Sequence, residues 1–172
     1  KIVYTPLCGT GNVPVRRVLS ELGFKNVYVV PEQENPDPKF TTLDYPNPED
    51  PKAFTYALKL AKEKDADIVL ATDPDADRLG VYAKDNKTGE YVAFTGNMSG
   101  MLIAEYILRE RTSTGTMPEN PAMVTTIVTT NMTFPITESY DVRLIEVLTG
   151  FKVIGEQIKL FEQTGCNNYV FG

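Results

Sequence analysis

The sequence has 172 residues, the length of one ordinary domain or two small ones, with 42% hydrophobic and 23% charged residues. No apolar run approaches the roughly 18 residues of a membrane-spanning helix, so we expect a soluble globular protein without a membrane role. The net charge of −6 opposes the phosphate neutralisation on which nucleic-acid binding depends, so nucleic acid is not an expected partner. The chain has no histidine, which excludes Ser-His-Asp and Cys-His catalysis and His-ligated zinc built from its own residues.

The cysteine content predicts a cellular location, and the two ends of the chain indicate how much of the protein is present. Two cysteines, Cys8 and Cys166, do not make a disulfide framework, and no signal-like leader precedes them, so a reducing cytoplasm is the expected location. Cys8 has no histidine partner and is predicted to be a small buried filler. The chain opens without Met on an apolar run and stops just after another, which indicates a piece of a longer protein.

The first part of the chain alternates β-branched runs with segments of helical period, which is typical of an α/β architecture. In chain order, the predicted elements are a strand at 2–4, a helix at 12–22, a strand at 27–30, a helix at 52–64 and a strand at 68–71. Residues 31–51 hold six of the 12 prolines. Because proline fixes φ and lacks a backbone donor, a long ordered loop is predicted there.

The second part begins with a predicted β-hairpin, 79–83 and 91–94, which adds antiparallel strands to the sheet. A helix at 99–111 follows, with Leu102, Ile103, Tyr106 and Ile107 predicted to face inward. Further elements are a strand at 123–128, an apolar run at 142–148, a helix at 156–163 and a closing strand. Residues 131–140 show no strong apolar period, and no element is predicted there.

These elements predict a mixed-sheet, three-layer α/β domain followed by part of a second similar domain. The first domain is expected to cover residues 1–111. Residues 112–121, where small polar residues, a glycine and two prolines interrupt all periodicity, are expected to be a linker. The partial second domain would then cover residues 122–172.

The strongest chemical feature is the run Thr72-Asp73-Pro74-Asp75-Ala76-Asp77-Arg78, directly after a predicted buried strand. In open α/β sheets, ligands bind in the loops beyond the carboxyl ends of the strands. Two carboxylates about 4 Å apart repel by roughly 4 kcal/mol at an effective dielectric constant near 20, so three that converge need a cation. Arg78 supplies one positive charge, and ligands made only of oxygen favour a hard ion such as Mg²⁺.

The aspartate run and the glycine run each allow other interpretations. An EF-hand is excluded because its sixth position would be Arg78 and its twelfth Lys84, where glycine and glutamate are required. A solvated acidic turn, whose aspartates cap the local backbone, remains the alternative to a metal site. The run Gly9-Thr10-Gly11 could cradle a phosphate before a helix, but without a Walker A pattern a tight strand-to-helix turn is favoured.

At the aspartate run the chain resembles the α-D-phosphohexomutase superfamily, the phosphoglucomutases and phosphomannomutases, whose magnesium loop has the form Asp-x-Asp-x-Asp-Arg. Further segments resemble the family in the same order along the chain: 5–11, Phe40 with 46–49, 95–97, 125–129, and 149–152 with 154–156. The resemblance implies a four-domain enzyme, of which this chain is the second domain and much of the third. The missing first and fourth domains of the same chain would be its partners.

The resemblance also implies an activity and a set of site residues. The reaction would interconvert hexose 1-phosphate and hexose 6-phosphate through a phosphoserine carried on the absent first domain, so the isolated chain is predicted to be inactive. Asp73, Asp75 and Asp77 would bind the Mg²⁺ cofactor, and Arg78 would be catalytic and contact the hexose phosphate substrate. Three residues would add to the sugar-phosphate wall: Thr149, Gly150 and Lys152.

Two functions of other classes remain as alternatives. A Mg²⁺-dependent phosphatase with an aspartate nucleophile would need Asp-x-Asp at the end of the first strand, where Tyr4-Thr5-Pro6-Leu7 offers no carboxylate. A non-enzymatic module that binds a divalent ion or a nucleotide could act through a partner. Glucose and mannose are not distinguished by these residues.

Overall fold

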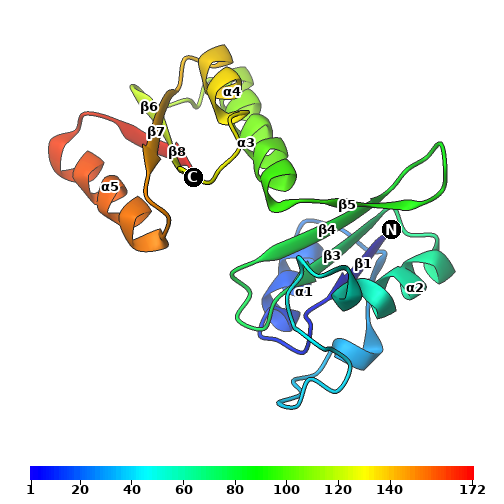
Figure 1. The fold of residues 1–172 in the computed structure, drawn as a ribbon. Coiled ribbons are helices and arrows are strands. Elements are labelled where there is room, and N and C mark those ends of the chain that lie inside the picture. The colour runs from blue at the N-terminus through cyan, green and yellow to red at the C-terminus, as the bar shows by residue number, and fades with distance from the viewer. The chain divides into compact units, whose positions relative to one another are not determined.

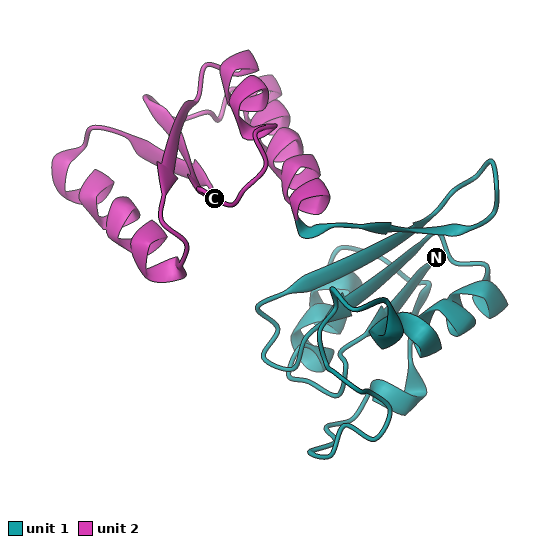
Figure 2. Cartoon of the chain, viewed as in Figure 1, with its two compact units in different colours: residues 1–96 teal, residues 97–172 magenta.

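The computed structural model describes all residues from Lys1 to Gly172 (Figure 1). They form two compact units, Lys1–Gly96 and Asn97–Gly172, which are coloured separately in Figure 2. Each unit is a sheet with helices packed on it, so the predicted α/β class is confirmed. No helix combines the length and the apolar character needed to cross a bilayer.

Unit 1 is built on a five-stranded mixed sheet with the order β2-β1-β3-β4-β5. Its strands are β1 (Ile2–Thr5), β2 (Val27–Val29), β3 (Ile68–Thr72), β4 (Leu79–Lys84) and β5 (Tyr91–Phe94). Strand β1 lies between β2 and β3 and is parallel to both, whereas β4 and β5 form the predicted antiparallel hairpin. The carboxyl ends of β1 and β3 therefore meet at one edge of the sheet.

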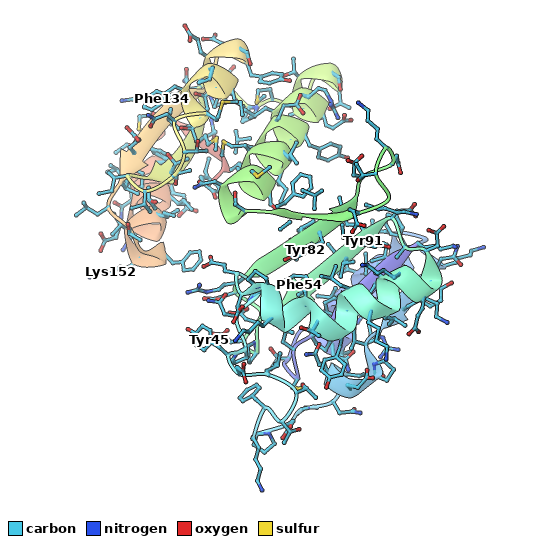
Figure 3. All side chains as sticks on the ribbon, turned by 45° about the vertical axis from the view of Figure 1, so that its right-hand side comes forward. Tyr45, Phe54, Tyr82, Tyr91, Phe134 and Lys152 are labelled. Carbon is cyan, nitrogen blue, oxygen red and sulfur yellow. The ribbon has the colours of Figure 1, made fainter.

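Two helices cover this sheet, α1 (Asn12–Glu21) and α2 (Thr55–Lys64). Figure 1 shows them on opposite faces, as two right-handed crossovers in a 2-1-3 strand order require. The 31–51 loop is irregular apart from the short 3₁₀ helix η1 (Pro31–Gln33), and a second one, η2 (Pro51–Phe54), leads into α2. Under α2, the Phe54 ring lies 4.5 Å from the Tyr82 ring, centroid to centroid (Figure 3).

Unit 2 is a smaller α/β/α layer structure on a parallel sheet with the order β7-β6-β8. Its strands are β6 (Pro121–Thr126), β7 (Arg143–Val147) and β8 (Asn168–Phe171), and its helices are α3 (Gly96–Ser113), α4 (Thr133–Ser139) and α5 (Phe151–Thr164). Side chains of α3 and α4 pack on one face of the sheet, and those of α5 pack on the other.

The division between the units differs from the predicted one. The linker was expected at 112–121, after the helix, but the structure divides the chain at Gly96, before most of α3. Ala104 and Leu108 of α3 pack with Met123, Val142 and Val170 of unit 2, so the helix belongs to the second core. Residues 112–121 are the end of α3 and a turn that leads into β6.

The predicted inward face of α3 is corrected by the structure. Leu102, Ile103 and Tyr106 are 57, 42 and 56% exposed, whereas Ala104 and Leu108 are fully buried. Apolar residues occur around most of this helix, so their spacing alone does not select the buried face.

Residues 131–140, for which no element was predicted, contain α4. Pro135 is the third residue of this helix, where backbone N–H groups have no partner within the helix, so the proline removes no hydrogen bond.

Candidate metal centre

The acidic loop joins β3 to β4 at the carboxyl edge of the unit 1 sheet. Asp73 follows the last residue of β3 and is 7% exposed, whereas Asp75 and Asp77 are exposed. One carboxylate oxygen from each of the three lies within 4.8 Å of the others. The fold thus brings together the three aspartates that were predicted as metal ligands.

The backbone of the loop closes on Asp73. The Asp73 carboxylate accepts the Arg78 N–H at 2.9 Å, and the Asp73 carbonyl accepts the Ala76 N–H at 3.0 Å. Ala76 has a left-handed φ of +61°, a conformation that costs a non-glycine residue about 1 to 2 kcal/mol. The hydrogen bond from the Ala76 N–H to the Asp73 carbonyl helps to hold this conformation.

Hydrogen bonding distinguishes Asp73 from the other two aspartates. Capping accounts for Asp73, but the Asp75 and Asp77 carboxylates accept no hydrogen bond in the structure. Asp75 and Asp77 therefore do not cap the loop backbone, and their exposed carboxylates are open to solvent or to a cation.

The Arg78 guanidinium faces three carboxylates. Its Nη1 lies 3.7 Å from Glu49 Oε2, and its Nε lies 3.8 Å from Asp73 Oδ2 and 3.9 Å from Asp77 Oδ1. With Asp75 included, four carboxylates and one guanidinium carry a formal charge of −3. Because the side chain of Arg78 is 52% exposed, the guanidinium is also open to a ligand.

Glu49 is the residue of this centre that was not predicted as a site residue. Pro48 is buried against β4, where a Cβ on Gly80 would lie 2.6 Å from the Pro48 carbonyl oxygen. The missing side chain at Gly80 therefore lets the proline-rich loop approach the sheet and bring Glu49 to Arg78. The motif Pro46-Asn47-Pro48-Glu49 was noted in the sequence, but no spacing rule connects it with Arg78.

The residues of the centre fit Mg²⁺. Carboxylate oxygens are hard ligands, and Mg²⁺ takes six ligands at about 2.1 Å, which puts opposite ligand oxygens about 4.2 Å apart. Since Asp75 and Asp77 are exposed, small rotations of their side chains bring oxygens now within 4.8 Å to such distances.

The three predicted substrate residues lie together in unit 2, at the carboxyl end of β7. Thr149 and Gly150 form the exposed turn before α5, and Gly150 has a φ of +132°, which favours glycine. Lys152 is the second residue of α5, its side chain is 86% exposed, and its Nζ lies 3.8 Å from Glu156 Oε1. Figure 3 shows Lys152 at the start of the helix.

Cys8 is buried, as predicted for a filler, and burial is the main factor that raises the pKa of its thiol. It follows Leu7 at the end of β1, and both residues have left-handed φ values, +46° for Leu7 and +61° for Cys8. The following run Gly9-Thr10-Gly11 forms the turn between β1 and α1.

The chain is thus an α/β protein of two α/β/α units, and an acidic loop lies at the carboxyl end of the central strand of the first. Sequence models identify the family: that of phosphoglucomutase/phosphomannomutase alpha/beta/alpha domain II matches residues 1–89, and that of alpha/beta/alpha domain III matches residues 95–172. The chain belongs to the phosphoglucomutase/phosphomannomutase family and comprises its domains II and III.

Individual relatives agree with this assignment. The chain is 37% identical over 170 residues to the phosphoribomutase of Saccharomyces cerevisiae, covering 95% of this chain and 27% of the relative. It is also 37% identical over 172 residues to a phosphoglucomutase of Staphylococcus epidermidis, covering all of this chain and 30% of the relative. The chain therefore spans less than a third of the length of these curated relatives.

A solved structure shares the fold. The phosphoglucomutase/phosphomannomutase family protein of Burkholderia thailandensis matches with a TM-score of 0.70 and 21% identity, over 98% of this chain and 33% of that one. The family and the α/β/α fold implied by the sequence motifs are confirmed.

Proposed function

We propose that this chain supplies the metal site and part of the sugar-phosphate wall of a mutase that interconverts hexose 1-phosphate and hexose 6-phosphate. The observation that carries the proposal is the convergence of Asp73, Asp75 and Asp77 beside Arg78, in a chain of the phosphoglucomutase/phosphomannomutase family. The two free cysteines, Cys8 and Cys166, are in keeping with a cytoplasmic enzyme.

The roles of the residues follow from their chemistry. Asp73, Asp75 and Asp77 would hold Mg²⁺, which when bound offsets the negative charge of the transferring phosphoryl group. The exposed Arg78 guanidinium would donate hydrogen bonds to phosphoryl oxygens, a geometry that its planar fork favours. Phosphoryl transfer depends mainly on positioning and charge, so the lack of histidine in this chain is no obstacle.

The position of Lys152 supports a role in binding a substrate phosphate. A cation in the first turn of a helix is unfavourable next to the helix dipole, and a lysine placed before glutamate at i,i+4 is the weaker orientation of such a pair. Helix stability therefore does not explain Lys152. Together with Thr149 and the backbone at Gly150, it would contribute to the wall that binds the sugar phosphate.

The remaining chemistry would come from parts of the protein outside these 172 residues. A phosphoserine on the first domain would donate its phosphoryl group to the substrate, and the fourth domain would add further phosphate contacts. The isolated chain would then form no hexose 6-phosphate, because it carries no phosphoryl donor.

The test is a coupled assay of glucose 6-phosphate formation from glucose 1-phosphate by the whole protein, with the wild type compared with Asp75→Asn. Mannose 1-phosphate and ribose 1-phosphate are assayed in parallel, because one relative is named for a ribose phosphate. We expect turnover that Asp75→Asn lowers at least about 100-fold, since charge stabilisation of the transition state is worth that much. Turnover that is equal in both proteins would remove the acidic loop from the reaction.

A further inference from the structure

The turn Gly9-Thr10-Gly11 between β1 and α1 makes specific contacts with the acidic loop. The Thr10 N–H and the Thr10 hydroxyl both donate to the carbonyl oxygen of Pro74, at 2.9 and 3.0 Å. Pro74 lies between two of the aspartates, Asp73 and Asp75. Two donors from one residue therefore hold the loop backbone at Pro74, between these two aspartates.

The glycines of the turn are required by this close approach. A Cβ on Gly9 would lie 2.4 Å from Pro74 Cα and 2.6 Å from Pro74 O, both backbone atoms that cannot move without the loop. A Cβ on Gly11 would lie 2.4 Å from Thr72 Oγ1. The turn thus packs against both Thr72, the last residue of β3, and Pro74 of the loop.

The turn is itself held from behind. The Cys8 N–H donates to the carbonyl of the buried Gln33 at 2.9 Å, and the Thr5 hydroxyl donates to Gln33 Oε1 at 2.7 Å. These contacts support the left-handed conformations of Leu7 and Cys8, which would otherwise be unfavourable. The turn is a fixed support for the acidic loop.

Hydrogen bonds within the protein occupy the backbone donors with which this turn could have bound a phosphate. The Cys8 N–H donates to Gln33, the Gly9 N–H donates to the Pro6 carbonyl, and the Thr10 N–H donates to Pro74. Three consecutive N–H groups are therefore engaged within the protein, and they are not free to bind an anion.

We propose that Gly9 and Thr10 are positioning residues that clamp the acidic loop in its metal-binding conformation; the metal part of this inference rests on the proposed function. Three carboxylates repel one another before an ion arrives, and a loop free to open would separate them. Fixing the Pro74 carbonyl keeps Asp73 and Asp75 together in advance, so that less order has to be gained on binding.

The test uses four variants of the 172-residue chain. Thr10→Val removes the hydroxyl donor and keeps the size of the side chain, whereas Thr10→Ser keeps the hydroxyl. Gly9→Ala adds a Cβ against Pro74. Gly100→Ala in α3 is the matched control, because a Cβ there meets no atom within 4 Å.

Two quantities are measured for each variant. The first, without metal, is the hydrogen-exchange rate of the Ala76 and Arg78 amides, which bond to Asp73 inside the loop. The second is the affinity for Mn²⁺, used as a paramagnetic probe of the magnesium site.

We expect Thr10→Val to raise the exchange rate and weaken Mn²⁺ binding by about 3- to 10-fold, the effect of one hydrogen bond. Thr10→Ser and Gly100→Ala should stay within about twofold of wild type, and Gly9→Ala should exceed the effect of Thr10→Val.

The outcomes separate the clamp from a general structural role and from the metal site. Equal losses in Thr10→Val and Thr10→Ser would overturn the clamp, as would amide exchange within twofold of wild type in both Thr10→Val and Gly9→Ala. If Gly9→Ala does not fold, the two Thr10 variants still decide. If the wild type does not bind Mn²⁺, the proposed function fails at its metal site, and the amide exchange still tests the clamp.

Discussion

The three aspartates of the loop differ in burial and in hydrogen bonding. Asp73 is nearly buried, and its carboxylate already accepts the Arg78 N–H, whereas Asp75 and Asp77 are exposed and accept no hydrogen bond. Asp73 thus shapes the loop as well as offering an oxygen. The other two carboxylates have no stabilising partner in the fold apart from Arg78, which lies 3.9 Å from Asp77.

Glu49 should tune the metal centre through Arg78. In Glu49→Gln one negative charge near the site is lost and the Arg78 guanidinium is left to Asp73 and Asp77, so both changes weaken the attraction for a divalent ion. We expect the Mn²⁺ affinity of the chain to fall by about 2- to 5-fold at low salt and by less at high salt, as for an exposed ion pair. Electron paramagnetic resonance at two ionic strengths measures it.

The control for Glu49→Gln is Glu63→Gln, which makes the same charge change at an exposed position of α2. An affinity that rises in Glu49→Gln, or that falls equally in both variants, would contradict a specific role for Glu49.

We expect Lys152 to contribute to the binding of the substrate and not to the stability of the fold. In the whole protein, Lys152→Ala should lower kcat/KM for the hexose phosphate by roughly 10- to 150-fold, the effect of losing one charged phosphate contact worth about 1.5 to 3 kcal/mol. The melting temperature should stay the same or rise slightly, because the cation opposes the helix dipole. Lys159→Ala on the same helix is the control, and activity within twofold of wild type in both variants would make Lys152 an ordinary surface lysine.

Among the single residues, the sequence predicted those whose spacing alone indicates a shared site. The aspartate run and its position after a strand were enough to propose a shared site, and the structure brings the three carboxylates together. Glu49 was not predictable, because its contact with Arg78 depends on how Pro48 packs against Gly80 of a distant strand. The clamp by Thr10 depends in the same way on tertiary contact.

Among the elements, the edge strand β5 is anchored by Tyr91. The Tyr91 hydroxyl lies 2.9 Å from the Ala61 carbonyl oxygen and 2.7 Å from that of Ala66, and these two acceptors at the end of α2 share its single proton. We expect Tyr91→Phe to lower the free energy of unfolding by about 1 kcal/mol, the usual contribution of such a hydrogen bond. Urea denaturation measures it, with Tyr45→Phe, an exposed tyrosine, as the control.

The contribution of Tyr91 to the free energy of unfolding should decrease at alkaline pH. Burial, more than any other factor, raises the pKa of Tyr91, so the folded protein retains the hydroxyl proton more strongly than the unfolded chain. The stability that this group contributes is fully present below the ordinary tyrosine pKa near 10 and is lost as pH rises through the raised value. A difference between wild type and Tyr91→Phe that grows with alkaline pH would contradict this.

The periodicity of apolar residues in the sequence predicted most of the elements but missed α4. The strands and α2 were predicted because β-branched runs and a clear apolar face identify them. Helix α4 was missed because its buried face carries Thr133 and Thr137, whose hydroxyls donate to the backbone carbonyls of Thr130 and Thr133. A helix whose two most buried residues are threonines satisfied by the backbone shows only a weak apolar period.

For the molecule as a whole, the two units have separate cores. Phe54→Ala should remove about 3 to 5 kcal/mol from unit 1, and Leu108→Ala about 2 to 5 kcal/mol from unit 2, because both side chains are fully buried. Residue-resolved hydrogen exchange should show lost protection within Lys1–Gly96 for the first variant and within Asn97–Gly172 for the second. Equal loss of protection in both units from one substitution would show that they unfold as one.

The sequence predicted the class of both units, but it placed their boundary too late. The composition of 112–121 resembles a linker, whereas the true division depends on Ala104 and Leu108 packing into the second core. Apolar residues occur around most of this helix, so its hydrophobic pattern does not show which core it joins, and only the partner strands do.

Binding of a divalent ion by the acidic loop can be measured as the affinity of the 172-residue chain for Mg²⁺, by competition with Mn²⁺. The wild type should bind weakly, because no substrate phosphate completes the coordination. Asp75→Asn should weaken binding at least about tenfold, since even residues that only orient a metal ligand are worth that much. The control is Asp141→Asn in unit 2, where asparagine tolerates the φ of +54°, and it should stay within twofold of wild type. Equal affinity of the wild type and Asp75→Asn would contradict the account.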